Sequence, residues 1–199
     1  MINLFDKIFY YTIKILMLIY MRLLYKLEVK GSFYVPKAGG VLLVGNHSSW
    51  IDTPILVNGI NRRFWFVSGD FIMQYPIMRA LLKHLFVIYL SKKDSKKGIA
   101  QTIEKLKEGE AVCIFPEGEL TYTGETQRFR NGVSIIQQAT NVPIVPFYID
   151  GAIDIWSRKQ TKQLFFKKIK LTFGEPFVPH AQTGSEIASE IREKVLTLR

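Results

Sequence analysis

Two short motifs, each following an apolar run, contain the residue types that acid–base catalysis requires. Asn46 to Asp52 read NHSSWID, which separates His47 from Asp52 by five residues, and Phe115 to Leu120 read FPEGEL. A histidine beside a carboxylate is the usual arrangement of a general base and the acid that orients it. Because a spacing of five does not bring side chains onto one helix face, the pair requires a turn, which the two intervening serines favour. We therefore predict a catalytic pair between a strand and a helix that starts near Asp52.

The second motif and a later basic segment contain residue types that suit an anion. Pro116 ends a strand, and Gly118 permits close backbone approach, as anion and oxyanion sites require. Arg128 and Arg130 precede a predicted helix, where two guanidinium groups are well placed to clamp a phosphate. A simple turn and a solvated charged loop are the competing interpretations of these two segments.

Composition narrows the class of protein. The 199 residues fit one domain, and the formal charge of +10 favours polyanionic partners such as nucleic acid, anionic lipid, phosphorylated small molecules or an acidic carrier protein. The single cysteine, Cys113, lies in an apolar run and is predicted to be a buried, inert thiol. His84 and His180 have neither a metal-ligand spacing nor an evident acid partner, so we interpret both as structural and expect no metal site.

Residues 1–26 have the pattern of an amphipathic membrane-anchoring helix. Their four cations fall within about a third of the helix circumference, and almost all other positions are apolar or aromatic. The cations interrupt the apolar run, so the segment matches neither a signal peptide nor a clean transmembrane span. A wide apolar face with a narrow cationic stripe favours a helix that lies in the membrane interface. Packing of the helix against the core is the competing interpretation.

A second basic stretch, Arg158 to Lys170, reads RKQTKQLFFKKIK. It suits a solvated surface, a dock for an acidic donor or a second membrane contact. We favour the membrane contact because Leu164, Phe165 and Phe166 can insert while the lysines meet lipid phosphates.

Apolar runs alternate with helical patterns along the rest of the chain, which predicts a single α/β domain with a central mixed, largely parallel sheet flanked by helices. Ligands in such sheets gather beyond the carboxyl ends of the strands, so the two motifs are expected to meet in one pocket. The predicted strands are 26–30, 41–46, 64–67, 86–90, 111–115, 143–149 and 168–173, and the predicted helices are 54–60, 70–84, 95–108, 132–140 and 185–198.

Four blocks, taken in order, resemble those of the glycerolipid acyltransferase family, of the 1-acylglycerol-3-phosphate acyltransferase type. They are N-H-x4-D, a strand with a basic end, F-P-E-G and V-P-I-V-P (Val142 to Pro146), and the basic end of the second block is shifted here to Lys92 and Lys93. The resemblance covers about residues 25 to 175 and implies an acyltransferase domain at 27–199. It implies transfer of a fatty acyl group from acyl-CoA or acyl carrier protein to the free hydroxyl of a lysophospholipid, without a cofactor. No serine or cysteine has a convincing nucleophile environment, which agrees with direct transfer.

The resemblance also implies roles for residues. His47 is the expected general base, and Asp52 is expected to orient and polarise it. The implied location is peripheral or monotopic, on the cytoplasmic face of the inner membrane, with membrane phospholipids as partners. The expected substrate-binding residues are Asn46, Lys92, Glu117, Gly118, Arg128 and Arg130. Glu117 is expected either to hydrogen-bond the glycerol hydroxyl of the acceptor or to hold its loop by bonding backbone N–H groups.

One departure from the family pattern bears on the acceptor. The family continues F-P-E-G-T-R, with an arginine that contacts the acceptor phosphate, whereas Glu119 and Leu120 stand here. The segment also resembles bacterial 2-acylglycerophosphoethanolamine acyltransferases. An additional acid repels a phosphate monoester and suits an ethanolamine headgroup, which favours a lysophosphodiester acceptor. Lysophosphatidic acid fits if Arg128, Arg130 or Lys92 supplies the lost cation.

A basic nucleic-acid-binding domain is the rival interpretation from another class. The sequence has no recognisable helix-turn-helix, RRM, KH or zinc motif, so we expect no nucleic-acid partner. The residues are also compatible with a non-catalytic lipid-binding protein and with a hydrolase in which His47 activates water.

Overall fold

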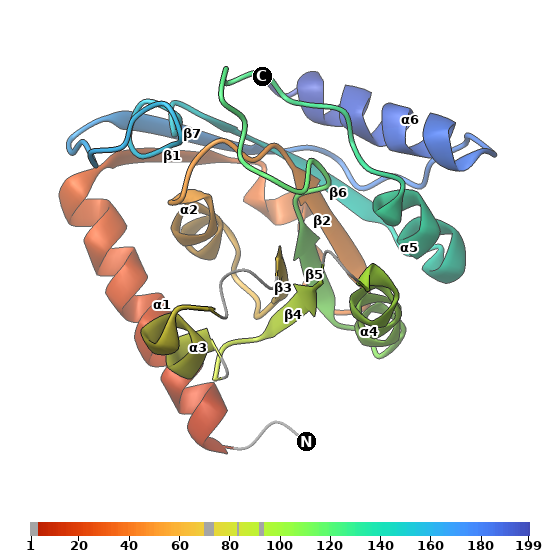
Figure 1. Cartoon of the computed structure of the whole chain (residues 1–199), viewed down its shortest axis with the longest axis horizontal. Coiled ribbons are helices and arrows are strands. Elements are labelled where there is room, and N and C mark those ends of the chain that lie inside the picture. Colours follow the sequence, from red (N-terminus) through yellow and green to blue (C-terminus); the bar gives the residue numbers. More distant parts are fainter. Residues whose placement is uncertain (1–3, 70–73, 83, 92–93) are drawn as a thin grey trace.

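The computed structural model describes residues 4–69, 74–82, 84–91 and 94–199. Seven strands form one sheet in the order β1-β7-β6-β2-β5-β3-β4 (Figure 1). Neighbouring strands are parallel except for β6 and β7, which confirms the predicted mixed, largely parallel sheet. The strands are β1 (Lys26–Lys30), β2 (Val41–Gly45), β3 (Trp65–Gly69), β4 (Val87–Leu90), β5 (Ala111–Ile114), β6 (Ile144–Asp150) and β7 (Lys168–Phe173).

The two central strands are buried on both faces. Every residue of β2 and β5 is buried, and alternate side chains belong to different hydrophobic clusters on the two sides of the sheet. Continuous apolar runs are what a strand covered on both faces requires. The parallel register pairs Leu43 with Cys113 and Val44 with Ile114. The turns that follow β2 and β5 therefore emerge side by side at one edge of the sheet.

Helices cover both faces of this sheet (Figure 1). On one face α1 packs against α2, and on the other α5 lies between α4 and α6. Their bounds are α1 (Leu4–Leu24), α2 (Asp52–Gly59), α3 (Pro76–Leu82), α4 (Ser95–Lys107), α5 (Gly132–Thr140) and α6 (Gly184–Leu196), and a short 3-10 turn spans Ser32–Tyr34.

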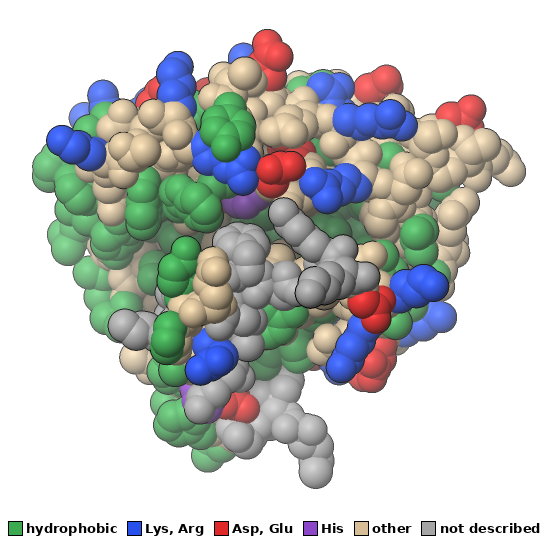
Figure 2. Space-filling view, in the orientation of Figure 1, with side chains coloured by type: hydrophobic (Ala, Val, Ile, Leu, Met, Phe, Trp, Pro, Cys, Tyr) green, Lys and Arg blue, Asp and Glu red, His purple; other side chains and the backbone are tan. Residues whose placement is uncertain are grey.

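Helix α1 divides its apolar surface between the core and the outside. Tyr10 and Met21 are buried against the domain, and Lys14 Nζ donates to the carbonyl of Ile60 at 2.8 Å, so this cation of the predicted stripe turns inward. Figure 2 shows hydrophobic side chains gathered over the outer side of α1. The exposed large apolar residues of this helix are Leu4, Phe5, Ile8, Tyr11, Ile15, Leu16, Ile19 and Leu23. Among the described residues, no helix combines the length and apolar content needed to cross a bilayer.

The predicted elements agree with the structure to within two residues at each end, with one exception. The helix predicted over 70–84 is wrong in extent: α3 spans only Pro76–Leu82, and residues 70–73 and 83 lie outside the described part. The second helix begins at Asp52, as the first motif predicts, and not at residue 54.

Gly45, the last residue of β2, is required by packing. A Cβ added to it would overlap the ring of Phe147, which lies opposite on β6 and is fully buried. We therefore expect Gly45→Ala to lower the free energy of unfolding by about 2 kcal/mol, measured by urea denaturation. Gly132→Ala is the matched control, because its methyl would meet only Ile99 Cδ1 at 3.9 Å. Equal unfolding midpoints for Gly45→Ala and the wild type would contradict this packing argument.

Candidate active site

The first motif forms a tight turn between β2 and α2. His47 Nδ1 lies 2.9 Å from Asp52 Oδ2, which also accepts the backbone N–H groups of Ser48 at 2.8 Å and Ser49 at 2.9 Å. Asp52 is completely buried and lies in the first turn of α2, where the helix dipole favours a negative charge. Because Asp52 engages Nδ1, Nε2 is the ring nitrogen that can take a proton from a substrate.

Phe115 forms one wall of the histidine site. Its ring stacks on the His47 imidazole with a centroid separation of 4.1 Å and an interplanar angle of 5°, and it is itself buried. The sequence assigned no role to Phe115, although the residue stands in the second motif. The signal for it in the sequence was an aromatic side chain at the end of β5, the strand beside β2.

Glu117 joins the two motifs. Its Oε1 accepts the backbone N–H of His47 at 2.7 Å, and its Oε2 accepts that of Gln127 at 2.8 Å. The side chain is buried, and this burial raises the pKa of Glu117 to about 7 despite the two backbone donors and the nearby His47, which favour the charged form. The expected meeting of the two motifs at one edge of the sheet is thus confirmed, and Glu117 makes the direct link.

Gly118 and Arg130 pack closely beside this link. Gly118 has a φ of 76°, which an L side chain rarely adopts, and an added Cβ would lie 2.6 Å from Arg130 Nε. Arg130 Nε donates to the carbonyl of Glu117 at 3.0 Å. Glycine is therefore required at position 118 for two reasons. It permits the positive φ of the turn, and it leaves room for the guanidinium of Arg130.

Glu119 lies between two arginines. One carboxylate oxygen is 3.4 Å from Arg130 Nη2, and the other is 3.1 Å from Arg158 Nη1. From the sequence, Glu119 was expected to be an unpaired acid that repels a phosphate. In the structure its charge is compensated by the two arginines, so this repulsion is no longer expected. Leu120, at the position of the family arginine, is buried. Sequence reasoning missed Arg158 as a member of this site because it lies 39 residues from Glu119 along the chain.

Three other predicted binding residues are placed as follows. The side chain of Asn46 is buried and exchanges two hydrogen bonds with the backbone of Ile149, so it ties the end of β2 to β6. Arg128 is exposed and lines a surface hollow with residues of α6 such as Arg192. The second arginine beside Arg130 is thus Arg158 and not Arg128. Lys92 lies outside the described residues.

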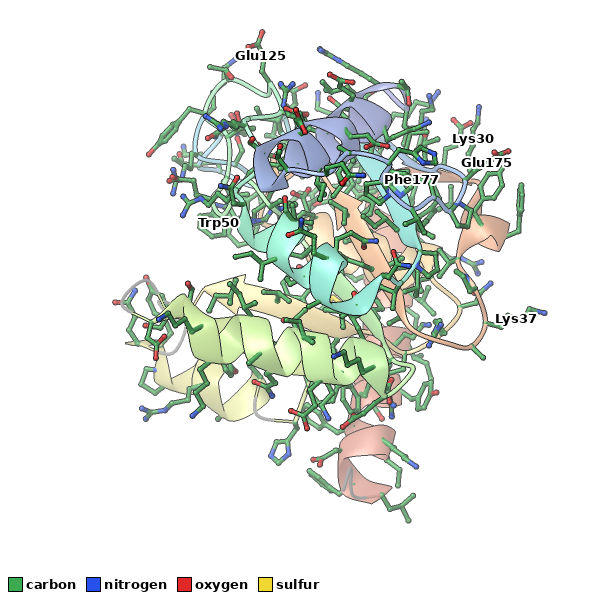
Figure 3. All side chains as sticks on the ribbon, turned by 90° about the vertical axis from the view of Figure 1, so that its right-hand side faces the viewer. Lys30, Lys37, Trp50, Glu125, Glu175 and Phe177 are labelled. Carbon is green, nitrogen blue, oxygen red and sulfur yellow. The ribbon has the colours of Figure 1, made fainter. Side chains whose placement is uncertain are left out.

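Figure 3 shows Trp50, which follows the carboxyl end of β2, on the opposite side of the molecule from Lys37, which precedes that strand. The reactive pair thus lies at the carboxyl edge of the sheet.

The remaining thiol and histidines lie apart from this pair. Cys113 is buried in the core, as predicted, and this burial raises the pKa of its thiol well above the ordinary value. His84 has an acid partner after all, because its Nδ1 lies 2.9 Å from Asp6 Oδ1 on α1. His180 is exposed.

Comparison with known proteins gives consistent relationships. A family model described as Acyltransferase matches residues 26–150. The chain is 25% identical over 175 residues to the chloroplastic 1-acyl-sn-glycerol-3-phosphate acyltransferase of Arabidopsis thaliana, covering 86% of this chain and 48% of that protein. It is 29% identical over 166 residues to the 1-acyl-sn-glycerol-3-phosphate acyltransferase of Bacillus subtilis, covering 82% and 78%.

The fold has a solved counterpart. The crystal structure of the 1-acyl-sn-glycerophosphate acyltransferase of Thermotoga maritima superposes with a TM-score of 0.75 at 23% identity, covering 87% of this chain and 71% of that chain. The chain spans about half the length of several curated relatives that it matches.

The raised pKa of Glu117 predicts a particular pH dependence of stability. A carboxyl group whose pKa rises from 4.5 to about 7 on folding contributes stability that is complete below pH 4.5 and lost as the pH rises through 7. Relative to Glu117→Gln, the wild type should therefore lose about 3 kcal/mol of unfolding free energy between pH 4.5 and pH 8, measured by denaturant titration. Glu125→Gln, at an exposed acid of the neighbouring loop, is the control and should follow the wild type. A constant difference between wild type and Glu117→Gln would contradict the raised pKa.

Proposed function

Because the chain belongs to the acyltransferase family, we propose that it transfers a fatty acyl group from a thioester, acyl-CoA or acyl carrier protein, to the free hydroxyl of a lysophospholipid. The observation that carries this proposal is the His47–Asp52 pair, held at the carboxyl edge of the sheet with Nε2 of the histidine free of the acid. Transfer to a hydroxyl requires a general base, and this pair supplies one. No metal or cofactor takes part in the proposed reaction.

The proposed reaction needs one base and no covalent enzyme intermediate. Nε2 of His47 takes the proton of the acceptor hydroxyl, and the oxygen attacks the thioester carbonyl. Buried Asp52 stabilises the imidazolium that forms. When the tetrahedral intermediate collapses, the carbon–sulfur bond breaks, and the imidazolium returns the proton to the departing thiolate. The ester and the free thiol are the products.

Lysophosphatidic acid is the acceptor that we place first. The relatives described above are named for 1-acyl-sn-glycerol-3-phosphate, which is lysophosphatidic acid. An ethanolamine headgroup was favoured only by an unpaired acid at position 119, and two arginines compensate that acid. Lysophosphatidylethanolamine is the second acceptor to test.

We further propose that residues 1–26 anchor the acyltransferase domain, residues 27–199, in the surface of the membrane that holds its lipid substrates, as a peripheral or monotopic protein on the cytoplasmic face of the inner membrane. The exposed apolar side of α1 supports this, because α1 is already packed on the domain through its other side. Exposed apolar surface of this extent is typical of an interface with lipid or protein.

The loop at 164–166 extends that apolar surface. Phe166 is 73% exposed and holds a positive φ of 59°, a strained conformation for a large side chain. Its N–H donates to the carbonyl of Leu24 at 2.7 Å, and Phe165 packs near Tyr25, so the loop is attached to the end of α1. The surrounding lysines suit anionic headgroups.

The base assignment predicts a large loss of activity without loss of the fold. His47→Ala should lower turnover at least about a hundredfold, and Asp52→Asn should be severe but less complete, in an assay with radiolabelled acyl-CoA or acyl carrier protein and lysophosphatidic acid. His180→Ala, at an exposed histidine, is the matched control. Unchanged turnover in His47→Ala would refute the base assignment. Fatty acid release at the same rate without acceptor would favour a hydrolase.

The membrane assignment predicts that both apolar segments contribute to binding. Ile8→Glu with Ile15→Glu, and separately Phe165→Ser with Phe166→Ser, should each lower flotation with phosphatidylglycerol vesicles about tenfold, because each pair removes apolar side chains from the lipid interface. Ile135→Glu is the control, since this residue of α5 is 50% exposed on the other face of the sheet. Flotation that neither pair reduces would contradict the assignment, and retention on DNA-cellulose without flotation would favour a nucleic-acid-binding protein.

A further inference from the structure

We propose that Arg158 and Arg130 together bind the phosphate of the acceptor headgroup and that Glu119 is the positioning residue that holds them. This inference rests on the proposed function and names the residues that replace the arginine of the family pattern. Arg158 lies outside the residues 26–150 that the family model matches, so the assignment depends on the structure of this chain.

Glu119 brings the two guanidinium groups together. Each of its carboxylate oxygens is near one arginine, at 3.4 Å for Arg130 and 3.1 Å for Arg158. A guanidinium has five N–H donors, and the contacts with acceptors described above use two on Arg130 and one on Arg158. Both side chains are partly exposed, at 61% and 28%, so donors remain for a ligand from solvent. Two planar donors around one point suit a phosphate monoester.

The segment that carries Arg158 is bonded to the turn between His47 and Asp52. The carbonyl of Trp156 accepts the backbone N–H of Trp50 at 3.1 Å and the hydroxyl of Ser49 at 2.5 Å. The buried Ser157 closes the local turn by accepting the N–H groups of the two residues after Arg158. The guanidinium also lies over the ring of Tyr122, 4.7 Å from its centroid. These contacts fix Arg158 before a ligand binds, which lowers the entropic cost of binding.

The charges of this group favour an anion close to the base. Two arginines and one glutamate leave one net positive charge. Glu119 is two residues from Glu117, which bonds to the backbone of His47, and Arg130 bonds to the carbonyl of Glu117. A phosphate bound there would keep the rest of a lysophospholipid near the base.

Exposed ion pairs contribute little to stability, so the contacts of Glu119 with the two arginines are expected to orient the guanidinium groups and not to stabilise the fold. The two interpretations of Glu119 also predict opposite effects. If the acid only repels the headgroup, then Glu119→Gln should lower KM for lysophosphatidic acid. If the acid positions the arginines, the same substitution should raise KM.

The test measures kcat and KM for lysophosphatidic acid and for lysophosphatidylethanolamine in the full chain. We expect Arg158→Gln to raise KM for lysophosphatidic acid about 10- to 100-fold with little change in kcat, because charged hydrogen bonds to the headgroup are lost. Arg158→Lys should restore part of the affinity, and Glu119→Gln should raise KM severalfold. Lys37→Gln removes an equal charge on the far side of the molecule (Figure 3) and should leave KM unchanged.

A second readout keeps this inference separate from the proposed function. Calorimetric titration of the wild type, Arg158→Gln and Lys37→Gln with a short-chain lysophosphatidic acid measures headgroup binding without turnover. If binding weakens at least about tenfold only in Arg158→Gln, the headgroup assignment is supported. If, in addition, no acceptor is acylated, the proposed acyl transfer is refuted while the headgroup assignment stands. Equal binding in all three proteins, or a lower KM in Glu119→Gln, would overturn the assignment.

Discussion

A completely buried carboxylate at the start of α2 requires hydrogen-bond donors from its own turn, and the position of the histidine depends on that requirement. An unpaired charge in the interior costs several kcal/mol, so Asp52 is stable only with partners. Two backbone N–H groups and His47 Nδ1 supply them at 2.8 to 2.9 Å. The same bonds that stabilise the acid direct the other ring nitrogen away from it. Phe115 restricts the remaining rotation of the ring by stacking on it.

Glu117, the second buried acid of the site, has a different role from Asp52. Glu117 bonds to backbone N–H groups on two loops, and its burial raises its pKa to about 7, with the nearby Asp52 acting in the same direction. Glu117 therefore serves as a structural link between the loops after β2 and β5. Both loops come from central strands that are covered on both faces, so the link connects two turns that follow the buried centre of the sheet.

The electrostatic effect of a charged side chain in this protein depends on neighbours that are distant in the chain. Glu119 considered alone predicts a site that repels a phosphate. Together with Arg130 and Arg158, however, it belongs to a group with a net positive charge. Lys14 shows the reverse case. Its position on α1 indicates a cation facing lipid headgroups, but it donates to the carbonyl of Ile60, and burial lowers its pKa. In both cases the relevant partner comes from another segment.

The sequence by itself determined the strand and helix pattern, the mixed and largely parallel sheet, and the meeting of the two motifs at one edge. These follow from local signals: apolar runs for covered strands, helical periodicity, and turn residues between His47 and Asp52. The tertiary structure alone decided that Phe115 stacks on the histidine, which backbone N–H groups Glu117 accepts and that Asn46 bonds to Ile149. It also decided that Arg158, and not Arg128, stands beside Arg130. The physical reason is that a side-chain partner depends on where separate loops converge in space, and the short-range periodicity of a single sequence contains no record of that convergence.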